Sequence, residues 1–209
     1  MKPGRDLMRS DELHEEIVRG LNAGAEVHAR LADACGEALL QAVHQIHKAM
    51  AARNKLLLFG NGGSAGDAQH TATEFVCRFG RNREALPAVA LTTDSSVLTA
   101  IANDFGFEQV FARQVRALGR TGDIAMGIST SGRSANVLEG VRAARELGLV
   151  TIALTGGAGG ELAQLADIVL LVPSEKTASV QECHIALLHA MCEATETLLY
   201  GDPPLEPGA

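Results

Sequence analysis

The chain has 209 residues, of which 46% are hydrophobic and only 3% aromatic, and its formal net charge is −7. This length and apolar fraction predict one domain, residues 1–209, with a full core. The acidic balance, without any basic patch or basic helix, excludes nucleic acid as a general electrostatic partner. None of the four cysteines has CxxC spacing, which favours reduced thiols over a disulfide framework.

The N-terminal residues lack the apolar segment of a secretory signal, and no stretch approaches the roughly 20 apolar residues that a membrane-spanning helix needs. The sequence therefore predicts no export and no membrane partner. We expect a cytoplasmic protein.

Residues 10–52 have apolar positions at helical spacing, with a break between two helices expected near residues 22–32. The second half carries an apolar stripe formed by Leu39, Leu40, Val43, Ile46 and Met50. Such a stripe must cover either the flank of the domain or another subunit. Since symmetric homo-oligomers are common, we expect this N-terminal helical extension to form an oligomer interface.

Residues 55–200 alternate between short apolar runs and helical segments, which is typical of parallel strands buried on both faces. The pattern predicts strands at 55–59, 88–91, 124–128, 151–154 and 168–172, and helices at 65–78, 95–118 (interrupted at 103–106), 135–147, 161–165 and 180–200. The expected fold is α/β, a three-layer, doubly wound, five-stranded parallel sheet. Residues 201–209 form a proline-rich tail that we expect to be frayed.

Ligands of such sheets bind beyond the carboxyl ends of the strands, so the loops that follow the strands are the candidate sites. The first loop, residues 60–64, is Gly-Asn-Gly-Gly-Ser. Its spacing Gly60-x-Gly62-x-x-Ala65 fits a loose dinucleotide fingerprint, with Asp94 as the acid that would hold a ribose. A plain strand-to-helix turn capped by Ser64 explains the same residues. Glycine-rich turns alone are weak evidence for a dinucleotide site, so the plain turn is favoured.

The loop after the third strand, residues 129–134, is Ser-Thr-Ser-Gly-Arg-Ser and precedes a helix. Hydroxyl donors and the free N–H groups of a helix N-terminus together bind anions. A nucleotide P-loop is excluded because no Gly-Lys-Ser/Thr is present, so a single phosphate monoester is the favoured ligand. The alternative is a serine-rich cap, although one hydroxyl would suffice for capping.

His70 and Glu74 are four residues apart on one helical face, as metal ligands, a proton-transfer pair or an ordinary solvated pair would be. Taken alone, the solvated pair is favoured. On the last helix Gln181 and His189 are eight residues apart, about 80° around the helix. His184 and His189 point roughly 140° apart and are not expected to share a site. Spacing does not choose among these side chains.

The ordered combination of these motifs resembles the sedoheptulose 7-phosphate isomerases (phosphoheptose isomerases) of the sugar isomerase (SIS) family. The motifs are Gly60-Asn61-Gly62-Gly63-Ser64, Asp67-Ala68-x-His70-x-x-x-Glu74, Asn103-Asp104-Phe105-Gly106, Ser129-Thr130-Ser131-Gly132-x-Ser134-x-Asn136, and Gln181-Glu182-x-His184 with His189. The resemblance covers about residues 10–200 and implies the SIS fold in a homotetramer.

The resemblance also implies roles for individual residues. One zinc ion per subunit would be bound by His70, Glu74, Gln181 and His189. The substrate would contact Asn61, Gly62, Gly63, Ser64, Glu74, Asn103, Asp104 and Gln181, and its phosphate would lie against Ser129, Thr130, Ser131 and Ser134.

The implied reaction converts sedoheptulose 7-phosphate to D-glycero-D-manno-heptose 7-phosphate through an enediol, as the first step of ADP- or GDP-heptose precursor synthesis. Glu74 is the candidate base and His189 the candidate acid. Lipopolysaccharide and capsule both remain open as destinations of the heptose. The alternative is a non-catalytic SIS protein that binds a replication initiator or senses a sugar phosphate. The initiator-binding relatives lack the glutamate and the last histidine, whereas this chain has both.

Overall fold

The computed structural model describes residues 10–201, so residues 1–9 and the expected frayed tail from residue 202 lie outside the described residues. The strands are β1 (Leu56–Gly60), β2 (Ala88–Ala90), β3 (Ile124–Ile128), β4 (Val150–Gly156) and β5 (Ile168–Val172). The helices are α1 (Ser10–Ala29), α2 (Leu31–Ala51), α3 (Gly63–Val76), α4 (Ser95–Phe105), the 3-10 turn η1 (Phe107–Gln109), α5 (Val110–Leu118), α6 (Ala135–Glu146), α7 (Leu162–Leu165) and α8 (Thr177–Tyr200).

The sheet has five strands in the order β2-β1-β3-β4-β5, and every neighbouring pair is parallel. All residues of β1 and β3 are buried, as expected for central strands with both faces covered. The predicted fold class, a doubly wound parallel sheet between helical layers, is confirmed.

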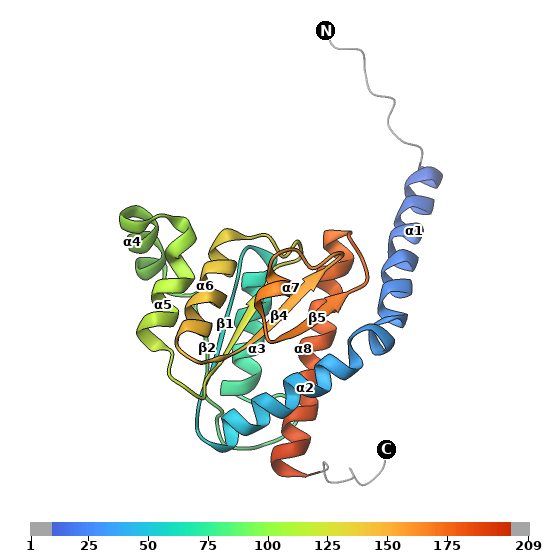
Figure 1. Ribbon diagram of the computed structural model, residues 1–209. Helices are drawn as coiled ribbons and strands as arrows, with labels where there is room; N and C mark the ends of the chain where they lie inside the picture. Colours follow the sequence, from blue (N-terminus) through green and yellow to red (C-terminus); the bar gives the residue numbers. More distant parts are fainter. Residues whose placement is uncertain (1–9, 202–209) are drawn as a thin grey trace.

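Two hydrophobic clusters lie on opposite faces of the sheet, because successive side chains of a strand point to opposite faces. Leu56 and Leu58 of β1 pack with α2, α3 and α8, whereas Leu57 and Phe59 pack with α5 and α6. Figure 1 shows these two helical layers on either side of the strands. The chain that follows a strand can therefore continue into a helix of either layer.

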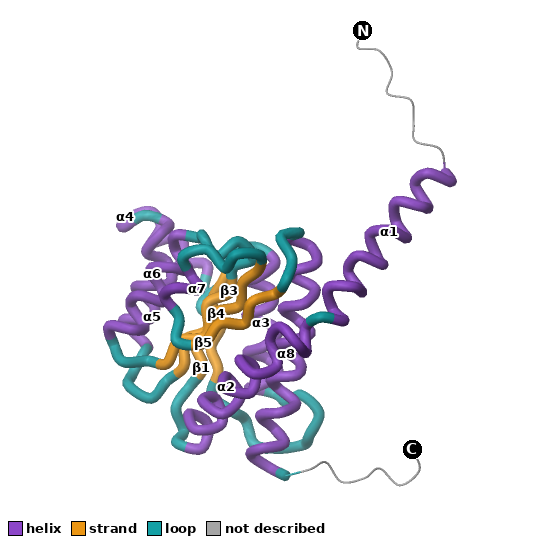
Figure 2. The backbone as a smooth tube through the Cα atoms, turned by 45° about the vertical axis from the view of Figure 1, so that its right-hand side comes forward, coloured by secondary structure: helices purple, strands orange, loops and turns teal. Residues whose placement is uncertain are grey.

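The helical extension divides at Arg30, inside the range predicted for the break. Most of the apolar stripe of α2 covers the domain's own flank: Val43, Ile46 and Met50 are buried in the core, and Leu40 is 50% exposed. α1 instead projects away from the body (Figures 1 and 2). It exposes the large apolar side chains of Leu13, Ile17, Val18 and Leu21.

Several smaller features of residues 10–201 bear on the sequence predictions. The segment 95–118 is interrupted at Gly106, whose φ of 90° ends α4. The last helix begins at Thr177, three residues before the predicted start. All four cysteines are free thiols, and only Cys77 is exposed. No helix in this range is long and apolar enough to cross a membrane.

Candidate functional site

The switch in strand order falls between β1 and β3, where α3 leaves towards one face and α6 towards the other. Ligands of doubly wound sheets bind in the crevice at this point, outside the carboxyl ends of the strands. Here the loop that follows β1 is hydrogen-bonded to the first turn of α6, which the serine-rich loop precedes. Asn61 and Asn136 exchange two side-chain hydrogen bonds of 2.8 Å each. The structure thus places the glycine loop beside the serine-rich loop.

A cluster of potential metal ligands lies between α3 and α8. His70 Nε2 is 3.1 Å from Glu74 Oε1 and 3.0 Å from His189 Nε2. One ligand atom from each of the three residues lies within 4.8 Å of the other two. His70 and Glu74 form the expected i,i+4 pair, with side chains 45% and 21% exposed, and His189 joins them from a segment more than a hundred residues away.

Gln181 lies two helical turns before His189, next to the first turn of α3. A Cβ atom on Gly63 would come within 1.5 Å of Gln181 Nε2, so the glycine makes room for this side chain. Gln181 also lines a cavity of about 390 Å³ together with Asp67 and His70. Gln181 therefore lines the same cavity as His70, beside the start of α3.

The hydroxyl groups of the serine-rich loop are not used as helix caps. Ser134 occupies the N-cap position of α6, but its side chain makes no capping hydrogen bond; its Oγ lies 3.0 Å from Ser129 Oγ. Ser131 is exposed, and its Oγ accepts a hydrogen bond from the N–H of Arg133. The interpretation of this loop as a plain serine cap is wrong, and its hydroxyls and helix N-terminus remain suited to an anion.

Ser64 does not cap α3 either. Gly62 holds the N-cap position with a φ of 55°, and no side chain caps this helix end. Asp94, the residue weighed as a ribose ligand, caps α4 instead, since its carboxylate accepts a hydrogen bond of 3.0 Å from the N–H of Val97. Nothing here strengthens the dinucleotide interpretation.

Asn103 and Asp104 are not brought to the ligand cluster within one chain. Both are exposed near the end of α4, where Asn103 Nδ2 donates to Asp104 Oδ1 over 2.7 Å. The apolar side of α4 packs on the cluster formed with α5 and α6, whereas α3 and α8 belong to the other face.

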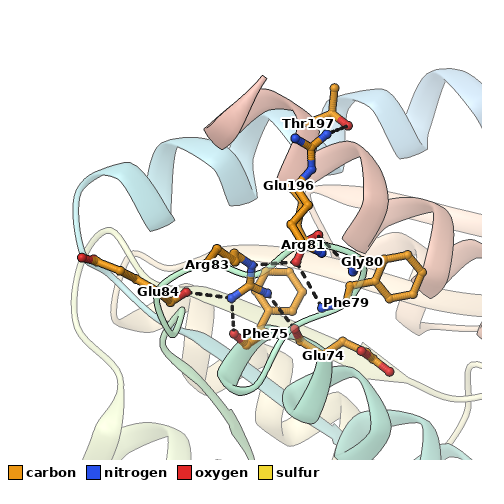
Figure 3. A network of polar contacts seen from close by, with 9 residues as sticks. All are labelled: Glu74, Phe75, Phe79, Gly80, Arg81, Arg83, Glu84, Glu196 and Thr197. Carbon is orange, nitrogen blue, oxygen red and sulfur yellow. Dashed lines mark hydrogen bonds and ion pairs between the residues drawn. The ribbon is translucent and has the colours of Figure 1, made fainter. Parts of the chain in front are cut away.

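Two charged residues with buried side chains were not predicted from the sequence to belong to this region. Arg83 follows α3 and Glu196 lies on α8, and their side chains, each 3% exposed, form an ion pair of 2.6 Å (Figure 3). Breaking a buried pair by removing one partner typically costs about 3–5 kcal/mol. Burial alone would raise the pKa of Glu196, but hydrogen bonds from Phe79, Arg83 and Gly80 outweigh it and hold the pKa below its usual range. No sequence signal pairs two residues 113 positions apart.

Asp67 is a further polar residue of this region, three residues before His70 on the same face of α3. Its Oδ2 atom is buried and has no hydrogen-bond partner among the described residues. Burial raises the pKa of Asp67 to about 6, with His70 acting in the opposite direction.

Known proteins give this fold and site a family. The model of the SIS domain family matches residues 21–156, well over half of the chain. This match and the open parallel sheet define a SIS domain protein.

Among curated relatives, the phosphoheptose isomerase of Roseiflexus sp. (strain RS-1) is 48% identical over 191 residues, 91% of this chain and 97% of that protein. The solved structure of phosphoheptose isomerase from Neisseria gonorrhoeae superimposes with a TM-score of 0.84 at 45% identity, over 88% of this chain and 99% of that one. The structure of a phosphoheptose isomerase from Francisella tularensis gives a TM-score of 0.86 at 37% identity, over 91% and 100%. The chain belongs to the phosphoheptose isomerase family of SIS domain proteins.

Proposed function

We propose that this chain isomerises sedoheptulose 7-phosphate to D-glycero-D-manno-heptose 7-phosphate. The observation that carries the proposal is the His70–Glu74–His189 cluster on two adjacent helices, in a fold shared with solved phosphoheptose isomerases. Relatives that match nearly their whole length to this chain are named for this isomerisation of a phosphorylated heptose.

The donor set of the cluster fits a divalent cation. Two imidazole nitrogens face each other at 3.0 Å with a carboxylate oxygen 3.1 Å from one of them, and nitrogen with oxygen donors is a common ligand set for zinc. We therefore assign His70, Glu74 and His189 as zinc ligands, with Gln181 from the adjoining cavity as the fourth. A bound zinc ion would supply a Lewis acid for the oxygens of the substrate.

The remaining roles follow from the chemistry of a ketose–aldose interconversion, in which a proton moves between adjacent carbons through an enediol. Glu74 is the proposed base that removes and returns this proton, and His189 the acid that serves the neighbouring oxygen. Glu74 thereby has two proposed roles, ligand and base. The hydroxyls and backbone N–H groups of residues 129–134 would bind the phosphate, and residues 61–64 would contact the sugar.

Assembly and location belong to the same proposal. The exposed apolar side chains of α1 and the separation of Asn103 and Asp104 from the cluster support a homotetramer in which helices of the extension meet. We place the enzyme in the cytoplasm, where its phosphorylated substrate would be produced.

The test incubates the purified protein with sedoheptulose 7-phosphate and follows the formation of an aldoheptose 7-phosphate by NMR. We expect turnover, loss of at least about 100-fold in rate after chelation, and recovery on addition of zinc. Absence of product under every metal condition would overturn the isomerase and favour a non-catalytic SIS protein that binds a replication initiator or senses a sugar phosphate. Against that alternative, both Glu74 and His189 are present and adjacent to His70.

A further inference from the structure

The ion pair between Arg83 and Glu196 is fully satisfied although it is buried. Arg83 Nε donates to Glu196 Oε1 over 2.6 Å, and the rest of the guanidinium donates to the carbonyls of Glu74, Phe75 and Glu84. The carboxylate of Glu196 also accepts three consecutive backbone N–H groups, from Phe79, Gly80 and Arg81, each over 3.1 Å. Figure 3 shows the pair at the centre of this network.

The Arg83 end of the network fixes the backbone beneath one proposed ligand. α3 ends at Val76, so the carbonyls of its last turn lack partners within the helix. Arg83 fills this need with a hydrogen bond of 2.7 Å to the carbonyl of Glu74 and one of 2.9 Å to that of Phe75. The Glu74 side chain, 21% exposed, projects from the residue that Arg83 anchors.

The Glu196 end reaches the other helix of the cluster. Glu196 lies on α8 seven residues after His189, and the loop that it binds carries Phe79. The Phe79 ring lies against the His189 imidazole, with ring centroids 5.5 Å apart. A single charged pair thus connects the end of α3, the loop that follows it and the helix that bears His189.

We propose that Arg83 and Glu196 are positioning residues that hold α3 and α8 at the spacing at which His70, Glu74 and His189 bind one divalent cation. This inference rests on the proposed metal site. Neither residue is proposed to touch the substrate or the cation. Removing either charge lets the end of α3 shift against α8, and the three ligand atoms then no longer converge.

The test measures cobalt(II) affinity and the visible absorption spectrum of the cobalt-loaded protein, neither of which needs turnover. Outer residues that orient ligands typically change metal affinity by about 10–100-fold. We expect Glu196→Gln and Arg83→Met to weaken cobalt binding at least about tenfold and to alter the absorption bands. Arg83→Lys keeps the cation but cannot reach both carbonyls as well as the carboxylate, so we expect an intermediate loss.

Asp123→Asn is the matched control. Asp123 is also buried, and its carboxylate accepts hydrogen bonds from the N–H groups of Lys55 and Arg120 and from Lys55 Nζ, but it lies at the amino end of β3. We expect this variant to have a lower melting temperature but a cobalt affinity within about twofold of the wild type.

Unchanged cobalt affinity and spectrum in folded Glu196→Gln and Arg83→Lys would overturn the positioning role. An equal loss of cobalt affinity in Asp123→Asn would also overturn it. So would failure of Glu196→Gln, Arg83→Met and Arg83→Lys to fold, because the ion pair would then be purely structural. If the wild type binds no cobalt, the proposed metal site is wrong, and so is this inference. If the wild type binds cobalt, the Arg83 and Glu196 variants bind it more weakly, and the wild type still does not turn over sedoheptulose 7-phosphate, only the isomerase proposal is lost.

Discussion

Two regions of the molecule differ in how their polar groups are brought together: the contact between α3 and α8, and the loop between β3 and α6. The helix contact places side chains from residues 70–74 and residue 189 around one point and is backed by a buried ion pair. The loop gathers hydroxyls and backbone N–H groups within six consecutive residues. One region depends on how two distant segments pack, whereas the other groups its polar atoms within one short segment of the chain.

This difference predicts different kinetic consequences. Side chains that move protons act in the transition state, so changes between α3 and α8 should lower kcat. Groups that hold a distant phosphate act on substrate and transition state alike, so changes in the loop should raise KM. The predictions below test this division.

Glu74→Gln should have the largest effect. The amide cannot accept the proton, so we expect kcat to fall about 10³-fold with metal restored. Steady-state kinetics with metal content measured in parallel would show it, and Glu193→Gln, on the exposed side of α8, is the matched control. Turnover of Glu74→Gln within tenfold of the wild type would remove the base assignment.

His184 lies on the same helix as His189, but we expect it to affect the stability of the fold and not the reaction. It is fully buried, and burial lowers its pKa to about 4, against a smaller opposite effect of the Thr155 backbone. The unfolded chain therefore binds a proton near pH 6.5 that the folded chain takes up only near pH 4, so stability falls as the pH drops through this window. Between pH 7 and pH 5 the loss is about 2 kcal/mol.

The measurement is urea unfolding at pH 7 and pH 5 for the wild type and His184→Leu. We expect the difference between the two pH values to shrink by about 2 kcal/mol in the variant, whatever its absolute stability. An unchanged difference would mean that another group controls acid sensitivity.

Ser134→Ala should have the smallest effect, and this effect should be a higher KM. Loss of one hydrogen bond to a charged phosphate predicts a KM about tenfold higher, about 1.4 kcal/mol, with kcat nearly unchanged. Ser95→Ala, in an exposed serine at the start of α4, is the control. A fall in kcat at constant KM would instead connect Ser134 with the chemical step and break the division between the two regions.

The fold was largely predictable because its signals are local. The runs at 124–128 and 168–172 are apolar and bounded by turn residues, and the structure has β3 and β5 at these bounds. The ends of other elements moved by one to three residues, as at the start of α8, where Ser and Thr residues hid the first turn. The capping alternatives considered for Ser64 and for the serine-rich loop do not hold, because a hydroxyl that can cap a helix can equally remain free for another partner.

By itself, the sequence determined the alternation of strands and helices, the hydroxyl-rich composition of residues 129–134 and, through resemblance, the candidate site residues. Only the tertiary structure decided that His70 and Glu74 meet His189, that Gln181 lies against Gly63, and that Arg83 and Glu196 connect the two helices. The physical reason is range. Helical periodicity fixes which side chains share a face within a few residues, whereas the approach of α3 to α8 depends on sheet order and core packing over the whole chain.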